Sequence, residues 1–403
     1  MKIGIIREGK IPPDSRVPLI PEQCASIMGK YEGVDIVVQP SPGRCYPDEA
    51  YRHQNIRLTE DMQSCQVLMG VKEVPVDQLI PNKTYFFFSH TIKEQSYNRR
   101  LLQAVLEKNI RLIDYEVLTD DRGKRLIAFG KFAGMVGAHN GILTYGKRTG
   151  LFDLIRMKDC LDYAEARQIY KRMQWPPMKV VLTGTGRVGK GAALVLRDMG
   201  LREVEPDDFL NNSYDEAVFT VLACADYAAR KDGKPFRKQD FYENPAAYKS
   251  IFGPYAAAAD VMINGIYWDN EAPAFFTKED MQAPDFNIQV IADVTCDIAP
   301  VSSIPSTLRP STIPEPVFGF DPSTGTETPP YQPDAVDMMT IDNLPNELPR
   351  DASKAFGQQF MDYILPELLK PDSKVIERAT VAAGGKLGPH FQYLKGYVEG
   401  VSA

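Results

Sequence analysis

The sequence predicts an α/β protein with two doubly wound, mostly parallel sheets. Three observations support this class. Short apolar runs alternate with helical stretches in the first third of the chain, and a second series of the same kind begins at Lys179. The chain also has 403 residues, more than one ordinary domain of roughly 150 residues requires.

The first third contains five candidate strands, each short, rich in β-branched or aromatic residues and bounded by turn formers. They are Ile3–Ile6, Val34–Val38, Val67–Val71, Tyr85–Phe88 and Ile110–Tyr115. The segment Lys93–Lys108 carries leucines at 101, 102 and 106, which predicts an amphipathic helix. Strands that alternate with helices indicate a mainly parallel sheet covered on both faces.

Glycine and alanine are frequent in Phe132–Leu151, a stretch of helical length. We interpret it as the crossing between two domains, where small residues let helices approach closely; a glycine-rich loop is the alternative. A charged amphipathic helix is expected near Asp162–Met173.

The second series contains further strands and ends in a helix. The candidate strands are Lys179–Leu182, Val218–Leu222, Val261–Asn264 and Ile288–Val294. The proline-rich stretch Ser302–Pro333 is expected to be irregular. In Ala352–Lys370 a helical pattern places Phe356, Phe360, Ile364 and Leu368 on one face.

A glycine-rich motif follows the first strand of the second series. It reads Gly184-Thr185-Gly186-Arg187-Val188-Gly189 and leads into a helix that extends to about Asp198. In this context the first glycine allows a tight turn, the second lets the backbone approach a pyrophosphate, and the third lets the helix pack on the strand. Amides at the helix N-terminus then bind the diphosphate. The motif predicts a Rossmann domain for a nicotinamide dinucleotide; a purely structural turn is the alternative.

A carboxylate is expected about 20 residues after such a loop, where it accepts a hydrogen bond from the adenosine ribose. Glu205 and Asp207 lie 16 and 18 residues after Gly189. An acid there repels a 2′-phosphate and favours NAD over NADP. Neither residue ends a convincing apolar strand, so the choice between NAD and NADP stays open.

Basic side chains follow the strands of the first domain. Arg7 follows the first strand, Lys72 the third, and His90 and Lys93 the aromatic strand, while Arg16 lies in the first loop. Ligands bind at the carboxyl ends of strands in such sheets. Arginine binds carboxylates as a fork, and histidine or a desolvated lysine exchanges protons near neutral pH. The set predicts a site for a polycarboxylate; solvated loop residues are the alternative for each one.

Composition restricts the class of ligand further. Hydrophobic residues make up 44% and charged residues 25% of the chain, and the formal net charge is -7. This balance argues against a broad nucleic-acid or anionic-membrane surface. No apolar run approaches the ~18 residues of a membrane span, and the N-terminus is predicted as a strand and not as a signal peptide. We therefore expect a soluble, cytoplasmic protein that acts on small molecules.

Cysteines and histidines show no metal-binding pattern. The six cysteines are scattered without a C-x-x-C pair, which favours reduced thiols. The four histidines, at positions 53, 90, 139 and 390, have no ligand spacing, so we expect no metal site. The sequence carries no signal for a particular oligomeric state.

Several longer segments resemble the lysine–2-oxoglutarate reductase/saccharopine dehydrogenase (L-lysine-forming) family, which is related to alanine dehydrogenase and to the transhydrogenase α-subunit. The chain also resembles the reductase half of the bifunctional aminoadipate-semialdehyde synthase of animals and plants, including an insertion between about Asn211 and Ala259. The matching segments are Arg7–Pro18, Gly70–Glu73, Phe88–Lys93, Arg111–Glu116, Arg125–Gly130, Ile263–Trp268 and Thr340–Pro345.

The resemblance implies both an architecture and a reaction. A discontinuous substrate domain, residues 1–131 and 344–403, would accompany a dinucleotide-binding domain of residues 132–343. The reaction would be the reversible, NAD(P)-dependent condensation of L-lysine with 2-oxoglutarate to saccharopine, through imine formation and hydride transfer.

The resemblance also implies a role for each motif residue. Lys72 and His90 would be the acid–base pair, and Glu116 would meet the substrate ammonium. Asp342 would lie on the nicotinamide side. The residues that would hold carboxylates are Arg16, Lys93 and Arg125.

Two other functions are open. An alanine-dehydrogenase-like enzyme would use ammonia in place of lysine. A dinucleotide-binding sensor would have the fold without turnover, although the joint presence of Lys72, His90 and Asp342 argues against it.

Overall fold

The computed structural model describes residues 1–400 and divides the chain into two compact units. Unit 1 contains Met1–Phe129 and the chain from Pro349 onward, and unit 2 contains Gly130–Leu348. These limits differ slightly from the expected ones at 131 and 344. The second limit moves because the short helix η8 (Leu344–Glu347) packs against α4 (Gly130–Thr149) of unit 2.

Unit 1 contains an eight-stranded sheet in the order β18-β17-β6-β5-β4-β1-β2-β3. Strands β1 to β6 are parallel, and β17 and β18 add an antiparallel edge. All five predicted strands are present, whereas β3, β17 and β18 were not predicted. The bounds are β1 Lys2–Ile5, β2 Asp35–Val38, β3 Arg57–Leu58, β4 Val67–Met69, β5 Thr84–Phe87, β6 Arg111–Asp114, β17 Thr380–Ala383 and β18 Lys386–Leu387.

Helices cover this sheet, and one of them begins later than predicted. Helix α3 begins at Arg99 and not at Lys93, because Thr91–Lys93 forms a 3-10 turn and Glu94 takes a left-handed conformation with φ 55°. The helices of unit 1 are α1 Pro21–Lys30, α2 Asp48–His53, α3 Arg99–Glu107, α11 Pro349–Gln359, α12 Leu365–Leu368, α13 Lys374–Ala379 and α14 Lys395–Glu399.

The predicted helix Ala352–Lys370 is confirmed, with a change of register inside it. Helices α11 and α12 are joined by a π-helical turn, Phe360–Ile364, which inserts one extra residue per turn. Leu365 is therefore fully buried, while Leu368, which the regular spacing places in the core, is only half-buried.

Unit 2 contains a second eight-stranded sheet in the order β15-β14-β16-β13-β12-β7-β9-β8. All strands are parallel except the hairpin β14–β15. The two mixed, mostly parallel sheets confirm the predicted fold class. The bounds are β7 Met178–Thr183, β8 Arg202–Glu203, β9 Ala217–Leu222, β12 Val261–Asn264, β13 Val290–Asp293, β14 Val317–Asp321, β15 Thr326–Thr328 and β16 Val336–Met339.

The hairpin β14–β15 corrects the expectation that Ser302–Pro333 is irregular throughout. The apolar run Val317–Phe320 pairs with β16 although prolines flank it. Gly319 lies within β14 and lets the returning chain approach closely, since a Cβ there would lie 2.5 Å from the carbonyl oxygen of Pro329. The remaining helices of unit 2 are α5 Tyr163–Tyr170, α6 Arg187–Met199, α7 Pro206–Asn211, α8 Cys224–Tyr227, α9 Lys238–Glu243 and α10 Gly253–Ala258.

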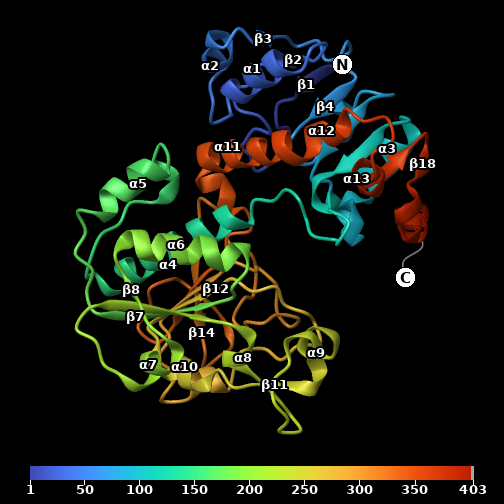
Figure 1. Cartoon of the computed structure of the whole chain (residues 1–403). Helices are drawn as coiled ribbons and strands as arrows, with labels where there is room; N and C mark the ends of the chain where they lie inside the picture. The colour runs from blue at the N-terminus through green and yellow to red at the C-terminus, as the bar shows by residue number, and fades with distance from the viewer. Residues whose placement is uncertain (401–403) are drawn as a thin grey trace. The chain divides into compact units, whose positions relative to one another are not determined.

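Helix α4 confirms the helical interpretation of Phe132–Leu151 and excludes the glycine-rich loop. It packs side by side with α6, as Figure 1 shows. Glycines make this contact close, because a Cβ on Gly134 would lie 1.9 Å from the Val188 carbonyl oxygen and a Cβ on Gly191 would lie 2.0 Å from that of Lys131. Within residues 1–400, no helix combines the length and apolar character needed to cross a membrane.

Candidate active site

The loops that carry Lys72 and His90 leave adjacent strands of unit 1. Strands β4 and β5 pair in parallel, and the pairing continues past their ends, since the Phe88 amide donates to the Val71 carbonyl at 3.0 Å. The two loops therefore leave the sheet at the same edge, where ligands bind in parallel sheets.

His90 is bound to a buried carboxylate. Its Nδ1 lies 2.6 Å from Oε1 of Glu73, whose side chain is 9% exposed, and Lys10 Nζ donates to both Glu73 oxygens at 2.9 and 2.8 Å. Burial acts to raise the pKa of Glu73, but the hydrogen bond and charge of His90, together with Lys10, outweigh it and lower this pKa to about 2. Glu73 therefore stays ionised and fixes the orientation of the imidazole.

Lys72 is half-buried beside other cations. Burial and the nearby charge of Arg16 lower its pKa below the usual value of 10.5. A lysine in this setting can lose its proton closer to neutral pH than a solvated one, as a general base requires.

Glu8 holds the backbone at Lys72. Its carboxylate accepts the amides of Val71 and Lys72 at 2.6 and 2.8 Å, and burial together with the charge of Asp14 raises its pKa to about 8. Sequence reasoning missed Glu8, which directly follows Arg7 after the first strand. The signal available was an acid at the carboxyl end of a predicted central strand.

Asp114 connects the His90 loop to the Glu116 turn. The amide and hydroxyl of Ser89 donate to its Oδ2 at 2.9 and 2.5 Å, and the Glu116 amide donates to its Oδ1 at 2.7 Å. The side chain is fully buried, and burial raises its pKa. Asp114 therefore positions residues on two loops, a role that its place inside an apolar strand did not reveal.

Glu116 lies between two cations predicted to hold carboxylates. Its Oε1 is 3.6 Å from Lys93 Nζ and 3.8 Å from Arg125 Nη1, both longer than a direct hydrogen bond. Arg125 also lies over the Phe88 ring, 5.5 Å from its centroid. The structure thus brings Glu116, Lys93 and Arg125 together as a loose cluster of one acid and two cations.

Arg16 and Arg7 are each paired with an acidic side chain of the protein itself. The Arg16 guanidinium is 4% exposed, lies 4.3 Å from the Phe129 ring centroid, and donates to both Asp14 oxygens at 3.0 and 2.6 Å. Much of its capacity to bind a substrate carboxylate is therefore used within the protein. Arg7 forms an exposed ion pair with Glu60 at 2.7 Å.

The glycine motif in unit 2 forms the turn that a dinucleotide requires. Gly184 has φ 99°, and its amide donates to the Leu222 carbonyl at 3.0 Å. A Cβ on Gly189 would lie 1.8 Å from the Gly184 carbonyl oxygen, whereas a Cβ on Gly186 would meet nothing within 4 Å. The open space above Gly186, at the start of α6, fits the diphosphate of NAD or NADP.

Glu205 and Asp207, the acids expected to bind the ribose, do not follow the strand next to β7. The strand beside β7 is β9 and not β8, because β8 pairs only with β9 at the edge of the sheet. Glu205 precedes α7 beyond this edge strand, and Asp207 lies within α7. Strand β8, between α6 and α7, has only two residues, and its spacing in the sequence does not reveal that it lies at the edge of the sheet.

Asp342 also lies in unit 2. It follows the bridge of Ile341 to Ser311 after β16 and is exposed. Its charge acts on Cys296, whose thiol donates to the Thr340 carbonyl at 3.1 Å. All six cysteines are free thiols, and residues 1–400 contain no cluster of three or more His, Cys, Asp or Glu side chains that could hold a metal ion.

Glu73 gives a pH-dependent prediction for stability. The pKa of Glu73 is about 2 in the folded protein, against 4.5 for a free glutamate in the unfolded chain. The contribution of Glu73 to stability is therefore complete above pH 4.5 and is lost as the pH falls towards 2. We expect Glu73→Gln to unfold several degrees below the unchanged protein at pH 7, and the difference to shrink between pH 5 and pH 3.5. Thermal unfolding followed by circular dichroism measures this, and a difference that does not change with pH contradicts it.

The sequence is similar to those of several known proteins. Residues 4–136 match the model of the alanine dehydrogenase/PNT N-terminal domain. The chain is 29% identical to an alpha-aminoadipic semialdehyde synthase of Arabidopsis thaliana over 97% of its own length but only 41% of that protein. It is 26% identical to a saccharopine dehydrogenase [NAD(+), L-lysine-forming] of Emericella nidulans, with 94% of this chain and 95% of that one covered.

The fold is also that of a solved structure. An L-alanine dehydrogenase superimposes over 100% of both chains with a TM-score of 0.67 at 16% identity. At this identity the match describes the architecture alone.

Proposed function

We propose that the chain, whose residues 4–136 match the model of the alanine dehydrogenase/PNT N-terminal domain, is an NAD(P)-dependent amino-acid dehydrogenase that joins L-lysine to 2-oxoglutarate and forms saccharopine. The observation that carries the proposal is the position of Lys72 and His90, which follow two adjacent parallel strands, with Glu73 fixing the imidazole. A relative named saccharopine dehydrogenase [NAD(+), L-lysine-forming] matches 94% of this chain, which supports the proposal.

The proposed reaction requires several proton transfers. The ε-amine of lysine attacks the ketone of 2-oxoglutarate, water leaves, and the resulting imine is reduced. Each step moves a proton at nitrogen or oxygen, and two groups with separated pKa values can exchange it. Lys72, whose pKa is lowered, serves as the base, and His90, held by ionised Glu73, donates and recovers the second proton.

The charges near these residues suit the substrates. 2-Oxoglutarate carries two carboxylates and saccharopine three, so cations are needed in a protein whose net charge is -7. Lys93 and Arg125 provide them, and we assign Glu116 to the substrate ammonium. Arg16 is assigned a supporting role through Asp14 and Phe129.

Unit 2 would hold the cofactor. Gly184, Gly186 and Gly189 would shape the turn for the diphosphate, and α6 begins directly after Gly186, where a Cβ would meet nothing within 4 Å. When bound, the nicotinamide supplies or accepts the hydride, and the protein contributes orientation and charge.

An assay of substrate pairs tests the proposal. Purified protein is mixed with NADH or NADPH, and the absorbance of the reduced cofactor is followed with lysine plus 2-oxoglutarate, ammonia plus pyruvate, and ammonia plus 2-oxoglutarate. We expect consumption with the first pair at a rate at least about 100-fold above the others, because only the first pair supplies both halves of saccharopine. Faster consumption with ammonia plus pyruvate would replace the proposal by an alanine-dehydrogenase activity.

A further inference from the structure

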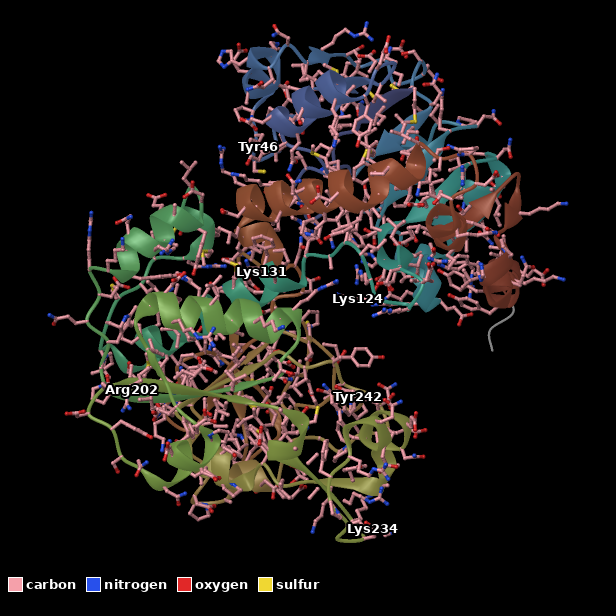
Figure 2. The ribbon with its side chains drawn as sticks, in the orientation of Figure 1. Tyr46, Lys124, Lys131, Arg202, Lys234 and Tyr242 are labelled. Atoms are coloured by element: carbon pink, nitrogen blue, oxygen red, sulfur yellow. The ribbon has the colours of Figure 1, made fainter. Side chains whose placement is uncertain are left out.

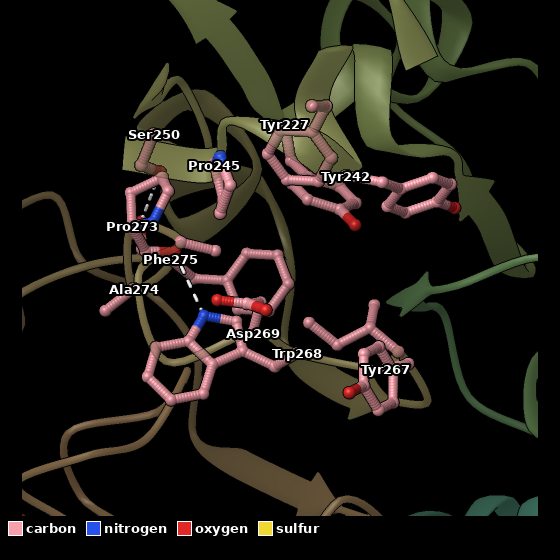
Figure 3. A pocket seen from close by; sticks show the side chains of 13 residues that line it. Tyr227, Tyr242, Pro245, Ser250, Tyr267, Trp268, Asp269, Pro273, Ala274 and Phe275 are labelled. Atoms are coloured by element: carbon pink, nitrogen blue, oxygen red, sulfur yellow. Dashed lines mark hydrogen bonds between the residues drawn. The ribbon is translucent and has the colours of Figure 1, made fainter. Parts of the chain in front are cut away.

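An aromatic pocket lies beside the glycine loop within unit 2. It has a volume of about 300 Å³, and the residues that line it include Tyr227, Tyr242, Ile266, Tyr267, Trp268 and Phe275. Figure 3 shows the rings of Tyr242, Tyr267 and Trp268 around it. This volume is at the lower end of the roughly 300–1,000 Å³ typical of small-molecule sites, so the pocket suits one ring system and not a whole dinucleotide.

The pocket adjoins the two strands that flank β7. On one side, β12 continues into Gly265 and Ile266; a Cβ on Gly184 would lie 2.6 Å from the Gly265 carbonyl oxygen and 3.1 Å from the Ile266 amide. On the other side, β9 ends at Leu222, whose carbonyl accepts the Gly184 amide at 3.0 Å. A ligand whose diphosphate lies on the glycine loop can therefore extend directly into the pocket.

The outer wall of the pocket comes from a segment added after β9. The hairpin β10 (Ala228–Arg230) and β11 (Tyr248–Ser250) spans residues that include α9, which carries Tyr242. Tyr242 is 54% and Tyr267 is 90% exposed, which is unusual for large aromatic side chains at a pocket. Figure 2 shows Tyr242 well apart from Arg202 of β8, next to which the expected ribose acid lies. Flat apolar walls with exposed rings favour a stacked heterocyclic base.

The residues at the end of β9 include an acid and no cation. The residues after Leu222 are Ala223, Cys224, Ala225 and Asp226, with no cation among them. Asp226 Oδ2 accepts the Ala223 amide at 2.7 Å, which holds the carboxylate beside the strand end. A carboxylate next to the central strand accepts a ribose hydroxyl and repels a 2′-phosphate. Within residues 1–400 no lysine or arginine lines the pocket.

We propose that this pocket holds the adenine and that Asp226 accepts a hydrogen bond from the adenosine ribose. The chain then prefers NAD(H) to NADP(H). The inference rests on the dinucleotide binding of the proposed function, and it replaces Glu205 by Asp226 as the selecting acid.

Titration calorimetry with NADH and NADPH, without substrates, tests the selection. We expect the unchanged protein to bind NADH about tenfold more tightly than NADPH, a difference that one repelled charge can produce. Asp226→Asn keeps an acceptor for the Ala223 amide but removes the charge, so it should reduce this ratio to about threefold or less, mainly through tighter NADPH binding. The matched control Glu205→Gln should leave the ratio unchanged.

The adenine position has its own readout. The chain has two tryptophans, so in Trp175→Phe only Trp268 remains. ADP-ribose should change the Trp268 fluorescence, and ADP-ribose with a 2′-phosphate should need about tenfold more ligand. ADP-ribose that binds by calorimetry without altering Trp268 fluorescence overturns the pocket assignment.

The outcomes separate this inference from the proposed function. Equal or tighter binding of NADPH, or a ratio that responds to Glu205→Gln and not to Asp226→Asn, overturns the selection by Asp226 and leaves the reaction untouched. Failure of both cofactors to bind overturns the proposed function together with this inference. Selective NADH binding without turnover of any substrate pair retains the inference and removes only the reaction.

Discussion

Lys72→Met and His90→Gln are each expected to reduce turnover about 10²- to 10⁴-fold, the usual effect of removing a general acid or base. Lys72 has a lowered pKa in the protein, and His90 is oriented by Glu73 at 2.6 Å, so neither role passes easily to a neighbouring group. Affinity for the reduced cofactor should change little, because the glycine loop belongs to unit 2. Steady-state rates and cofactor titrations on the same preparations measure both quantities.

Unit 1 provides matched controls for these two variants. Lys30→Met alters an exposed lysine at the end of α1, and His53→Gln alters a histidine whose side chain is 75% exposed. Both should retain full turnover. If Lys72→Met or His90→Gln also works at the unchanged rate, the proposed acid–base pair is wrong.

Gly134→Ala is expected to destabilise unit 2 strongly. The new Cβ would lie 1.9 Å from the Val188 carbonyl oxygen and 3.0 Å from the Ala192 amide nitrogen, and both belong to the backbone of α6. Helices α4 and α6 must then separate, and overpacking of this kind costs about 1–3 kcal/mol or more. Because α6 begins at the glycine motif, we also expect weaker binding of the reduced cofactor.

Thermal unfolding and cofactor titration check this prediction, with Gly253→Ala as the control. A Cβ on Gly253, at the start of α10, would meet nothing within 4 Å. The control should therefore unfold close to the unchanged protein. A Gly134→Ala protein as stable as this control would show that the two helices do not pack as described.

Strong local signals predicted most of the fold. The five apolar strands of unit 1 and the run from Val180 through the glycine motif are each long or distinctive enough to identify alone. The added edge strands β17 and β18 were not predicted, since an antiparallel edge depends on a partner far away in sequence. The π-helical turn at Phe360–Ile364 was also not predicted, although Pro366, which has no amide to donate, follows it in the sequence.

The candidate site was predictable only as a list of residues. The resemblance and the strand ends pointed to Lys72, His90, Lys93 and Arg125, but spacing does not reveal which carboxylate pairs with which cation. Glu8 and Asp114 act through backbone amides on other loops, so only the folded chain shows what they hold. Glu205 was chosen by counting residues, whereas sheet order decides which strand end adjoins the glycine loop.

The central claim is the reductive joining of an amino acid to a keto acid, and isotope transfer tests it most directly. NADH that carries deuterium at both C4 positions is incubated with the protein, lysine and 2-oxoglutarate, and the products are analysed by mass spectrometry. The account predicts saccharopine, the secondary amine of lysine and glutarate, with one deuterium on the carbon of the former ketone. Deuterium that appears only in glutamate, or unlabelled substrates after NADH has demonstrably bound, would contradict it.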